Sequence, residues 1–218
     1  MKEGFKVAAI IPAYNEENTL KEILKTLKRV KKIHQIMVIS DGSEDNTAEV
    51  AHECGVEVID LLDNRGKGGA IKAGIQHTDA EILVLLDGDL IGLTPRHVQQ
   101  LIDPVLLNEV EMSIGIFQQG RMATDLAQKM APFLSGQRAL RRKLIDNISQ
   151  LELSRFGVEV ALHTYTEEHH IPYREVKLPD LSHVMKEEKL GVAKGIAARI
   201  KMYWDILKYV LRFNQSPK

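Results

Sequence analysis

The sequence predicts an α/β fold, a single domain with a mostly parallel central sheet flanked by helices. Short aliphatic runs alternate with helical periodicity through the first ninety residues, a pattern typical of parallel strands covered on both faces. The 218 residues suit one domain with a small appendage. Hydrophobic residues make up 44% of the chain, which excludes a disordered protein.

The first half contains four expected strands and three expected helices. The strands are the apolar runs 7–11, 36–39, 56–59 and 82–86. In the first helix, leucine or isoleucine at positions 20, 23, 24 and 27 share one face. The second helix runs from Thr47 to Cys54, where Gly55 is a stop signal, and the third opens at Gly66.

The second half is more helical. We expect a helix from Pro95 to Asn108, helices over 123–148 with a break at 132–136, and a helix over 158–163. Strands are expected at 112–116 and 173–177. A C-terminal amphipathic helix completes the chain, with an apolar stripe from Ile196 to Leu211.

The charge balance, the cysteine count and the hydropathy exclude several classes of protein. Lys and Arg number 29 against 30 Asp and Glu, so we expect no nucleic-acid partner. A single cysteine, Cys54, excludes an intrachain disulfide and a Cys-rich metal site. No apolar run has the roughly 18–20 residues of a transmembrane segment, and the run 7–11 is too short for a signal peptide. We therefore expect a cytoplasmic protein whose membrane contacts, if it makes any, are peripheral.

Polar or glycine-rich clusters directly follow the predicted strands. They occupy residues 12–16, 40–45, 64–69 and 87–89. Ligands of open α/β sheets bind beyond the carboxyl ends of the strands, so these clusters should converge on one edge.

Two of these clusters suggest phosphate chemistry. Asp87 and Asp89 form a carboxylate pair that could hold Mg²⁺ or Mn²⁺, although Asp-x-Asp is also ordinary loop chemistry. Residues 66–69 read Gly-Lys-Gly-Gly and resemble a phosphate-cradling loop. They lack the spacing of a P-loop, so a tight turn with a solvated Lys67 is the alternative.

Taken in order, four motifs resemble the family 2 glycosyltransferases, whose fold is the Rossmann-like GT-A domain. The motifs read IIPAYNEE, VISDGSEDNT, GKG and LLDGDL, and the similarity covers about residues 6–116. The resemblance implies that residues 1–116 bind a nucleotide-sugar donor and that 117–190 form the acceptor side of the same domain. Residues 191–218 are then the C-terminal helix.

The resemblance also implies roles for individual residues. Those lining the nucleoside pocket or reading the base would be Pro12, Ala13, Glu16, Ser40 and Asp41. Relatives often carry two acids at the last two positions, where this chain has a serine first.

The remaining residues of the donor site would contact the ribose, the diphosphate and its metal ion. Lys67 matches a nucleotide-contacting lysine, Asp87 would face the ribose, and Asp89 would bind the metal that bridges the phosphates. A carboxylate and diphosphate oxygens suit Mg²⁺ or Mn²⁺.

The second half resembles the branch that contains glucosyl-3-phosphoglycerate synthase and mannosylglycerate synthase. In that branch a late histidine completes the metal site, and His183 matches it; the alternative is a surface histidine. Glu159 matches an acid near the sugar and acceptor, and would otherwise be a charge at a helix start. Arg121 matches a position that meets an acidic acceptor, and Ser135 and Gly136 fall in the acceptor-side motif.

Two departures from that branch concern the acceptor. Gln137 stands where the branch carries a glutamate, and an amide cannot act as a base near neutral pH. Met185 stands where a polar acceptor contact is expected. Phosphoglycerate is therefore not carried over as the acceptor, which could still be a small acidic molecule.

The expected activity is metal-dependent transfer of a hexosyl group from a nucleotide-diphosphate sugar, with a UDP-sugar favoured. Glu159 would be the base if configuration inverts, or would position the sugar if it is retained. A nucleotidyltransferase is the first alternative, although such an enzyme usually has a glycine- and arginine-rich loop after its first strand, where this chain has residues 12–16, Pro-Ala-Tyr-Asn-Glu. A catalytically silent nucleotide-sugar-binding protein stays open because of Gln137.

The C-terminal helix raises a third alternative, a peripheral enzyme of the inner membrane face with a polyprenyl-phosphate acceptor. Basic residues accompany its apolar stripe, namely Lys194, Arg199, Lys201 and Lys208. Otherwise the stripe packs on the domain, or on a second subunit as a homodimer contact.

Overall fold

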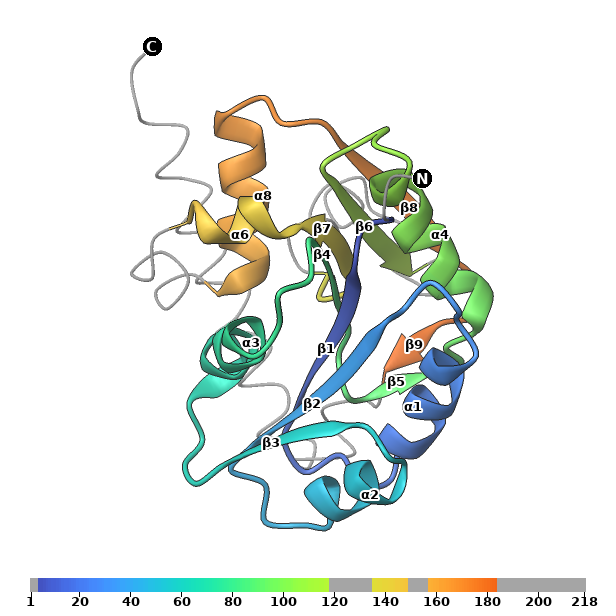
Figure 1. Ribbon diagram of the computed structural model, residues 1–218, viewed down its shortest axis with the longest axis vertical. Helices are drawn as coiled ribbons and strands as arrows, with labels where there is room; N and C mark the ends of the chain where they lie inside the picture. The colour runs from blue at the N-terminus through green and yellow to red at the C-terminus, as the bar shows by residue number, and fades with distance from the viewer. Residues whose placement is uncertain (1–3, 118–134, 149–156, 184–218) are drawn as a thin grey trace, which may run out of the picture. The chain divides into compact units, whose positions relative to one another are not determined.

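The computed structural model describes residues 4–117, 135–148 and 157–183 (Figure 1). All of them except His183 belong to one compact unit, Met1–Ser182, and a second unit begins at His183. The expected C-terminal helix lies outside the described residues, as do Arg121 and Met185. The division into a donor half and an acceptor half stays a prediction.

The core of the unit is a seven-stranded sheet in the order β3-β2-β1-β4-β7-β6-β8. Its strands are β1 (Val7–Ala13), β2 (Gln35–Asp41), β3 (Glu57–Leu61), β4 (Ile82–Leu85), β6 (Met112–Phe117), β7 (Arg138–Arg141) and β8 (Tyr173–Leu178). Strand β7 runs antiparallel to β4 and β6, whereas the other neighbours pair in parallel. The mostly parallel sheet predicted from the sequence is confirmed. A two-stranded sheet consists of β5 (Leu90–Ile91) and β9 (Ser182–His183).

Helices cover both faces of the central sheet (Figure 1). One face carries α1 (Leu20–Lys28), α2 (Thr47–Glu53) and α4 (Pro95–Leu106). The other carries α3 (Gly66–Gln76), α6 (Arg142–Asp146) and α8 (Val158–Glu168). Within the described ranges, no helix is long and apolar enough to cross a membrane.

Strand β1 shows why its sequence is apolar at almost every position. Val7, Ala9 and Ile11 pack into the layer beneath α1 and α4, whereas Ala8 and Ile10 pack into the layer beneath α3. Successive side chains of a strand point to opposite faces, so a strand buried on both sides needs apolar residues throughout.

The expectation of helix over residues 123–148 is wrong at Arg138–Arg141, which form β7. Arginine, alanine and leucine are good helix formers, but pairing with two strands overrides this local preference. The short strands β5 and β9 were also not expected from the sequence. The part of the predicted segment before residue 135 lies outside the described residues.

Candidate active site at the carboxyl edge of the sheet

The loops after β1 and β2 are joined by direct hydrogen bonds. Ala13 pairs with Ser40 at the ends of the two strands. Beyond them, the backbone nitrogen of Asn15 donates to Ser43 Oγ at 3.2 Å, and that of Glu44 donates to Asn15 Oδ1 at 2.8 Å. The first two polar clusters therefore form one continuous surface.

The turn after β4 packs against the first loop. Thr19 Oγ1 donates to the carbonyl oxygen of Gly88 at 2.7 Å. A Cβ atom at Gly88 would lie 3.2 Å from both Ala13 Cβ and Glu16 Cγ, so this turn approaches the first loop closely. The predicted convergence of these clusters on one edge is confirmed.

Ser40 and Asp41 end β2 and are both buried. Asp41 Oδ1 accepts a hydrogen bond from the backbone nitrogen of Arg65 at 2.8 Å, which ties the third loop to the second. The hydroxyl of Ser40 is buried without a hydrogen-bond partner among the described residues. A buried polar atom without a partner is unfavourable, so this hydroxyl marks a candidate position for a bound water or a ligand group.

Lys67 links two carboxylates from distant parts of the chain. Its Nζ forms ion pairs with Asp87, after β4, and with Glu159, in the first turn of α8. Burial lowers the pKa of Lys67, but the two carboxylates outweigh it and raise the pKa above its ordinary value. Lys67 therefore stays charged, and its two ion pairs contradict the alternative of a freely solvated lysine in a turn.

Gly136 makes room for this ion-paired cluster. Strands β4 and β7 pair in antiparallel register at Leu85 and Arg138, and continuing that register brings Asp87 opposite Gly136. A Cβ atom at Gly136 would overlap Lys67 Nζ and lie 2.5 Å from Asp87 Oδ2. Only glycine allows this approach without displacing one of the two side chains.

The residues beside Gly136 also contact the cluster or support it. Gln137 Nε2 donates to Asp87 Oδ2 at 2.9 Å. Ser135 Oγ donates to the carbonyl oxygen of Gly115 at 2.5 Å. Sequence reasoning assigned this stretch to the acceptor side and missed the contact of Gln137 with Asp87, for which a single sequence carries no local signal.

Arg138 lies beneath the cluster and is fully buried. Its Nε donates to the carbonyl oxygen of Ser135 at 2.9 Å, which holds the turn before β7. Burial lowers the pKa of Arg138 to about 10, opposed by the charge of Glu159. Burial and the nearby Arg138 lower the pKa of His163 to about 4, so this imidazole is neutral at pH 7.

The turn after β4 supplies the oxygen donors that a divalent cation would need. Asp87 and Asp89 flank Gly88 and are both partly exposed. Within the described ranges, no three His, Cys, Asp or Glu residues are grouped closely enough to hold a metal ion. Asp87 is already engaged by Lys67 and Gln137, so Asp89 is the carboxylate that fits Mg²⁺ or Mn²⁺ if diphosphate oxygens complete the coordination. The role of His183, the last described residue, stays a prediction.

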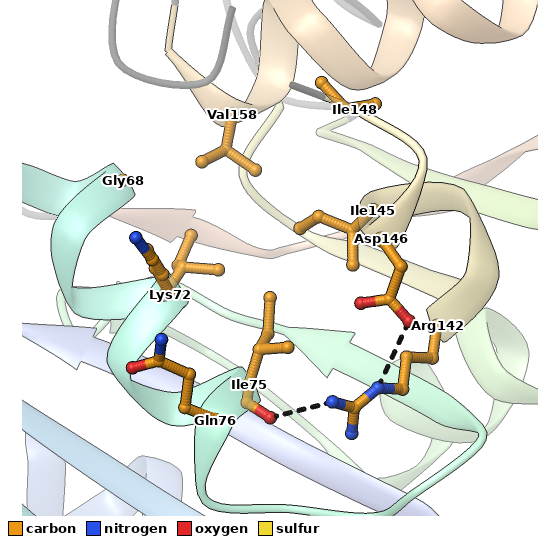
Figure 2. Close-up of a pocket in the computed structure, with 10 residues that line it drawn as sticks. Gly68, Lys72, Ile75, Gln76, Arg142, Ile145, Asp146, Ile148 and Val158 are labelled. Carbon is orange, nitrogen blue, oxygen red and sulfur yellow. Dashed lines mark hydrogen bonds and ion pairs between the residues drawn. The ribbon is translucent and has the colours of Figure 1, made fainter. Parts of the chain in front are cut away.

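A pocket of about 240 Å³ lies beside this cluster, between α3, α6 and the start of α8 (Figure 2). Its lining is largely apolar, including Ile75, Ile145 and Val158. Arg142 lines it too, but its guanidinium is engaged by Asp146 and by the carbonyl oxygen of Ile75. None of the predicted site residues lines this pocket.

Comparison with solved structures identifies the type of fold. Glucosyl-3-phosphoglycerate synthase of Mycobacterium tuberculosis, solved with Mn²⁺, UDP-glucose and phosphoglyceric acid, superimposes with a TM-score of 0.70 at 25% identity. The match covers 83% of this chain and 72% of that one. The fold is therefore GT-A-like.

The family follows from the sequence match. Residues 8–159 match the model of glycosyl transferase family 2, and the chain belongs to this family. It is 37% identical to protein MJ1222 of Methanocaldococcus jannaschii over 50% of its own length and 46% of that protein's. It is 27% identical to undecaprenyl-phosphate 4-deoxy-4-formamido-L-arabinose transferase of Edwardsiella ictaluri over 92% of its own length. The chain spans 66% of that transferase, so it is shorter than both relatives.

Proposed function

We propose that the protein is a metal-dependent glycosyltransferase that moves a hexosyl group from a UDP-sugar to an acceptor hydroxyl. The observation that carries the proposal is the convergence of four loops at one sheet edge, with Asp87, Lys67 and Glu159 in a single ion-paired cluster. Membership of glycosyl transferase family 2 and the GT-A-like fold also support this function.

The donor nucleotide would lie over the ends of β1 and β2. In this proposal Pro12, Ala13 and Glu16 line the nucleoside pocket, and Ser40 and Asp41 face the base. The unpartnered hydroxyl of Ser40 supports this placement, because a polar edge of the base could satisfy it.

The diphosphate and sugar would lie between the turn after β4 and the start of α8. Asp89, with His183, would hold Mg²⁺ or Mn²⁺, and the cation when bound stabilises the charge of the leaving diphosphate. Lys67 adds a fixed positive charge there. Glu159 orients the sugar, since its carboxylate is already anchored by Lys67.

The acceptor would enter from the side formed by Ser135 and Gly136, with Arg121 meeting an acidic group. A small acidic molecule is the first candidate, because the glucosyl-3-phosphoglycerate synthase that shares the fold was solved with phosphoglyceric acid. A polyprenyl phosphate is the second candidate, because the undecaprenyl-phosphate transferase matches 92% of this chain.

A donor panel tests the activity. UDP-, GDP- and ADP-sugars are incubated with Mn²⁺ or Mg²⁺, and free nucleotide is measured. We expect release from a UDP-sugar that stops when a chelator is added. Tight UDP binding without any release across the panel and a set of acceptors would instead identify a silent binding protein.

Liposome flotation separates the two acceptor classes. The full chain and a chain lacking residues 190–218 are compared on vesicles with and without polyprenyl phosphate. Flotation that requires both residues 190–218 and polyprenyl phosphate in the vesicles supports the lipid acceptor. The same flotation by both chains would contradict a membrane role for the C-terminal segment.

A further inference from the structure

We propose that Gln137 is a positioning residue whose side-chain amide holds the carboxylate of Asp87 in the orientation that the donor needs. The inference rests on the proposed function, in which Asp87 faces the ribose. Gln137 itself contacts no reacting atom in this scheme and acts through Asp87.

The contact is partly buried and directional. Gln137 is 2% exposed, and its Nε2 lies 2.9 Å from Asp87 Oδ2. An ionised carboxylate only accepts hydrogen bonds, so the amide must turn its nitrogen toward Asp87. Hydrogen bonds to a charged acceptor are among the stronger ones in proteins.

The backbone of Gln137 is held from behind. Ser135 Oγ donates its one proton to the carbonyl oxygen of Gly115 at 2.5 Å, and it accepts from the backbone nitrogen of Gln137 at 3.3 Å. The backbone nitrogen of Gly115 also donates to the carbonyl oxygen of Gln137 at 2.8 Å. Strand β6 and the turn before β7 therefore fix the backbone from which the side chain of Gln137 reaches Asp87.

The two oxygens of Asp87 meet different donors. Oδ1 is ion-paired with Lys67, whose Nζ also pairs with Glu159, whereas Oδ2 accepts from Gln137 Nε2. The lysine neutralises the charge of the carboxylate, and the amide adds a directional contact to the other oxygen that limits its rotation.

The amide of Gln137 is neutral, and the charged groups around it already balance one another. Lys67 and Arg138 are balanced by Asp87 and Glu159. A glutamate at position 137 would place a second carboxylate against Asp87, where like charges repel. Glutamine keeps the contact attractive.

A double-mutant cycle tests the inference. Gln137→Met keeps the side-chain length but removes the donor, Asp87→Ala removes the acceptor, and the double variant combines them. The affinities for UDP and for 2′-deoxy-UDP are measured with Mn²⁺ by calorimetry, and the urea midpoint is measured without ligand. Gln76→Met, at an exposed glutamine at the end of α3, is the matched control.

We expect Gln137→Met to reduce the preference for UDP over 2′-deoxy-UDP by about threefold to tenfold, the range of one lost hydrogen bond. In the Asp87→Ala background the same change should have no further effect, and Gln76→Met should keep the wild-type preference. If Gln137→Met does not fold, Gln137→Glu has nearly the same shape and is expected to lose the preference as well.

Three distinct results would contradict one proposal or the other. If wild type binds UDP and both Gln137 variants keep its ribose preference, the positioning role is wrong although the donor site stands. If wild type binds no UDP with Mn²⁺, the proposed function fails, and with it the ribose-directed role of Gln137. Additive changes in the urea midpoint would show that the two side chains are not coupled.

Discussion

The ammonium group of Lys67 is ion-paired with the carboxylate of Glu159, which joins the first turn of α3 to the first turn of α8. The two helices cover the same face of the sheet but are far apart in sequence. Asp87 binds the same ammonium group from the end of β4. The ammonium group of Lys67 thus brings together α3, α8 and the turn after β4 at the candidate active site.

Removal of the Lys67 ammonium group should destabilise the ligand-free protein, because the negative charges of Asp87 and Glu159 would then lose their ion-pair partner. These side chains keep part of their surface in water, so we expect Lys67→Met to cost about 1–2 kcal/mol, less than a fully buried pair. Urea denaturation measures the loss. Lys143→Met, which breaks an exposed pair with Glu111, is the control and should cost under about 0.5 kcal/mol. Equal losses in both variants would contradict a structural role for the cluster.

Ser40→Ala should affect stability and ligand binding in opposite directions. The hydroxyl of Ser40 is buried without a partner among the described residues, so its removal should leave stability unchanged or raise it. UDP affinity should fall, because the uracil base loses a hydrogen-bond partner on the protein. Thermal unfolding and calorimetry measure the two effects.

A second buried serine provides the control for this prediction. Ser113 Oγ donates to the carbonyl oxygen of Leu101, so Ser113→Ala should lose about 1 kcal/mol of stability. UDP affinity should not change in this variant. A fall in stability of Ser40→Ala as large as that of Ser113→Ala would show that the hydroxyl of Ser40 already has a partner in the folded protein.

The buried imidazole of His163 should make stability depend on pH. Its pKa is lowered from 6.5 to about 4 in the folded protein, first by burial and then by the charge of Arg138. Between these two values the unfolded chain binds the proton and the folded protein does not, so stability falls as the pH drops from about 6.5 to about 4. The full effect is at most about 3 kcal/mol.

Unfolding measured across this pH range checks the prediction. His163→Phe should flatten the profile between pH 6.5 and 4, since phenylalanine keeps the ring that meets Tyr173 edge-on. His52→Gln, at an exposed histidine in α2, should leave the slope as in wild type. An unchanged slope in His163→Phe would assign the pH dependence to other groups.

Asp89→Ala should abolish metal-dependent release of nucleotide from a UDP-sugar. Loss of a cation ligand should lower turnover by about 100-fold or more, because the leaving diphosphate loses its main stabilisation. Asp63→Ala, at an exposed position of the loop after β3, is the control and should keep wild-type activity. Full activity of Asp89→Ala in the presence of a chelator would contradict the metal-dependent mechanism.

The sequence by itself determined the α/β class and the edge of the sheet at which to look. Apolar runs such as 7–11 and 82–86 must be buried strands, and the polar clusters follow them directly. Because the carboxyl ends of parallel strands share one edge, this local order was enough to predict the convergence of the loops. The family could also be predicted from the sequence, because each of the four motifs is a contiguous stretch of the chain.

The tertiary structure alone decided the surroundings of Asp87. Gln137 lies 50 positions away in sequence, and the contact exists because β7 pairs antiparallel with β4 at one particular register. That register depends on burial from both sides, which overrides the helical preference of Arg138–Arg141. A local pattern carries no information about such a pairing, so the roles of Gly136 and Gln137 became visible only once the strands were placed side by side.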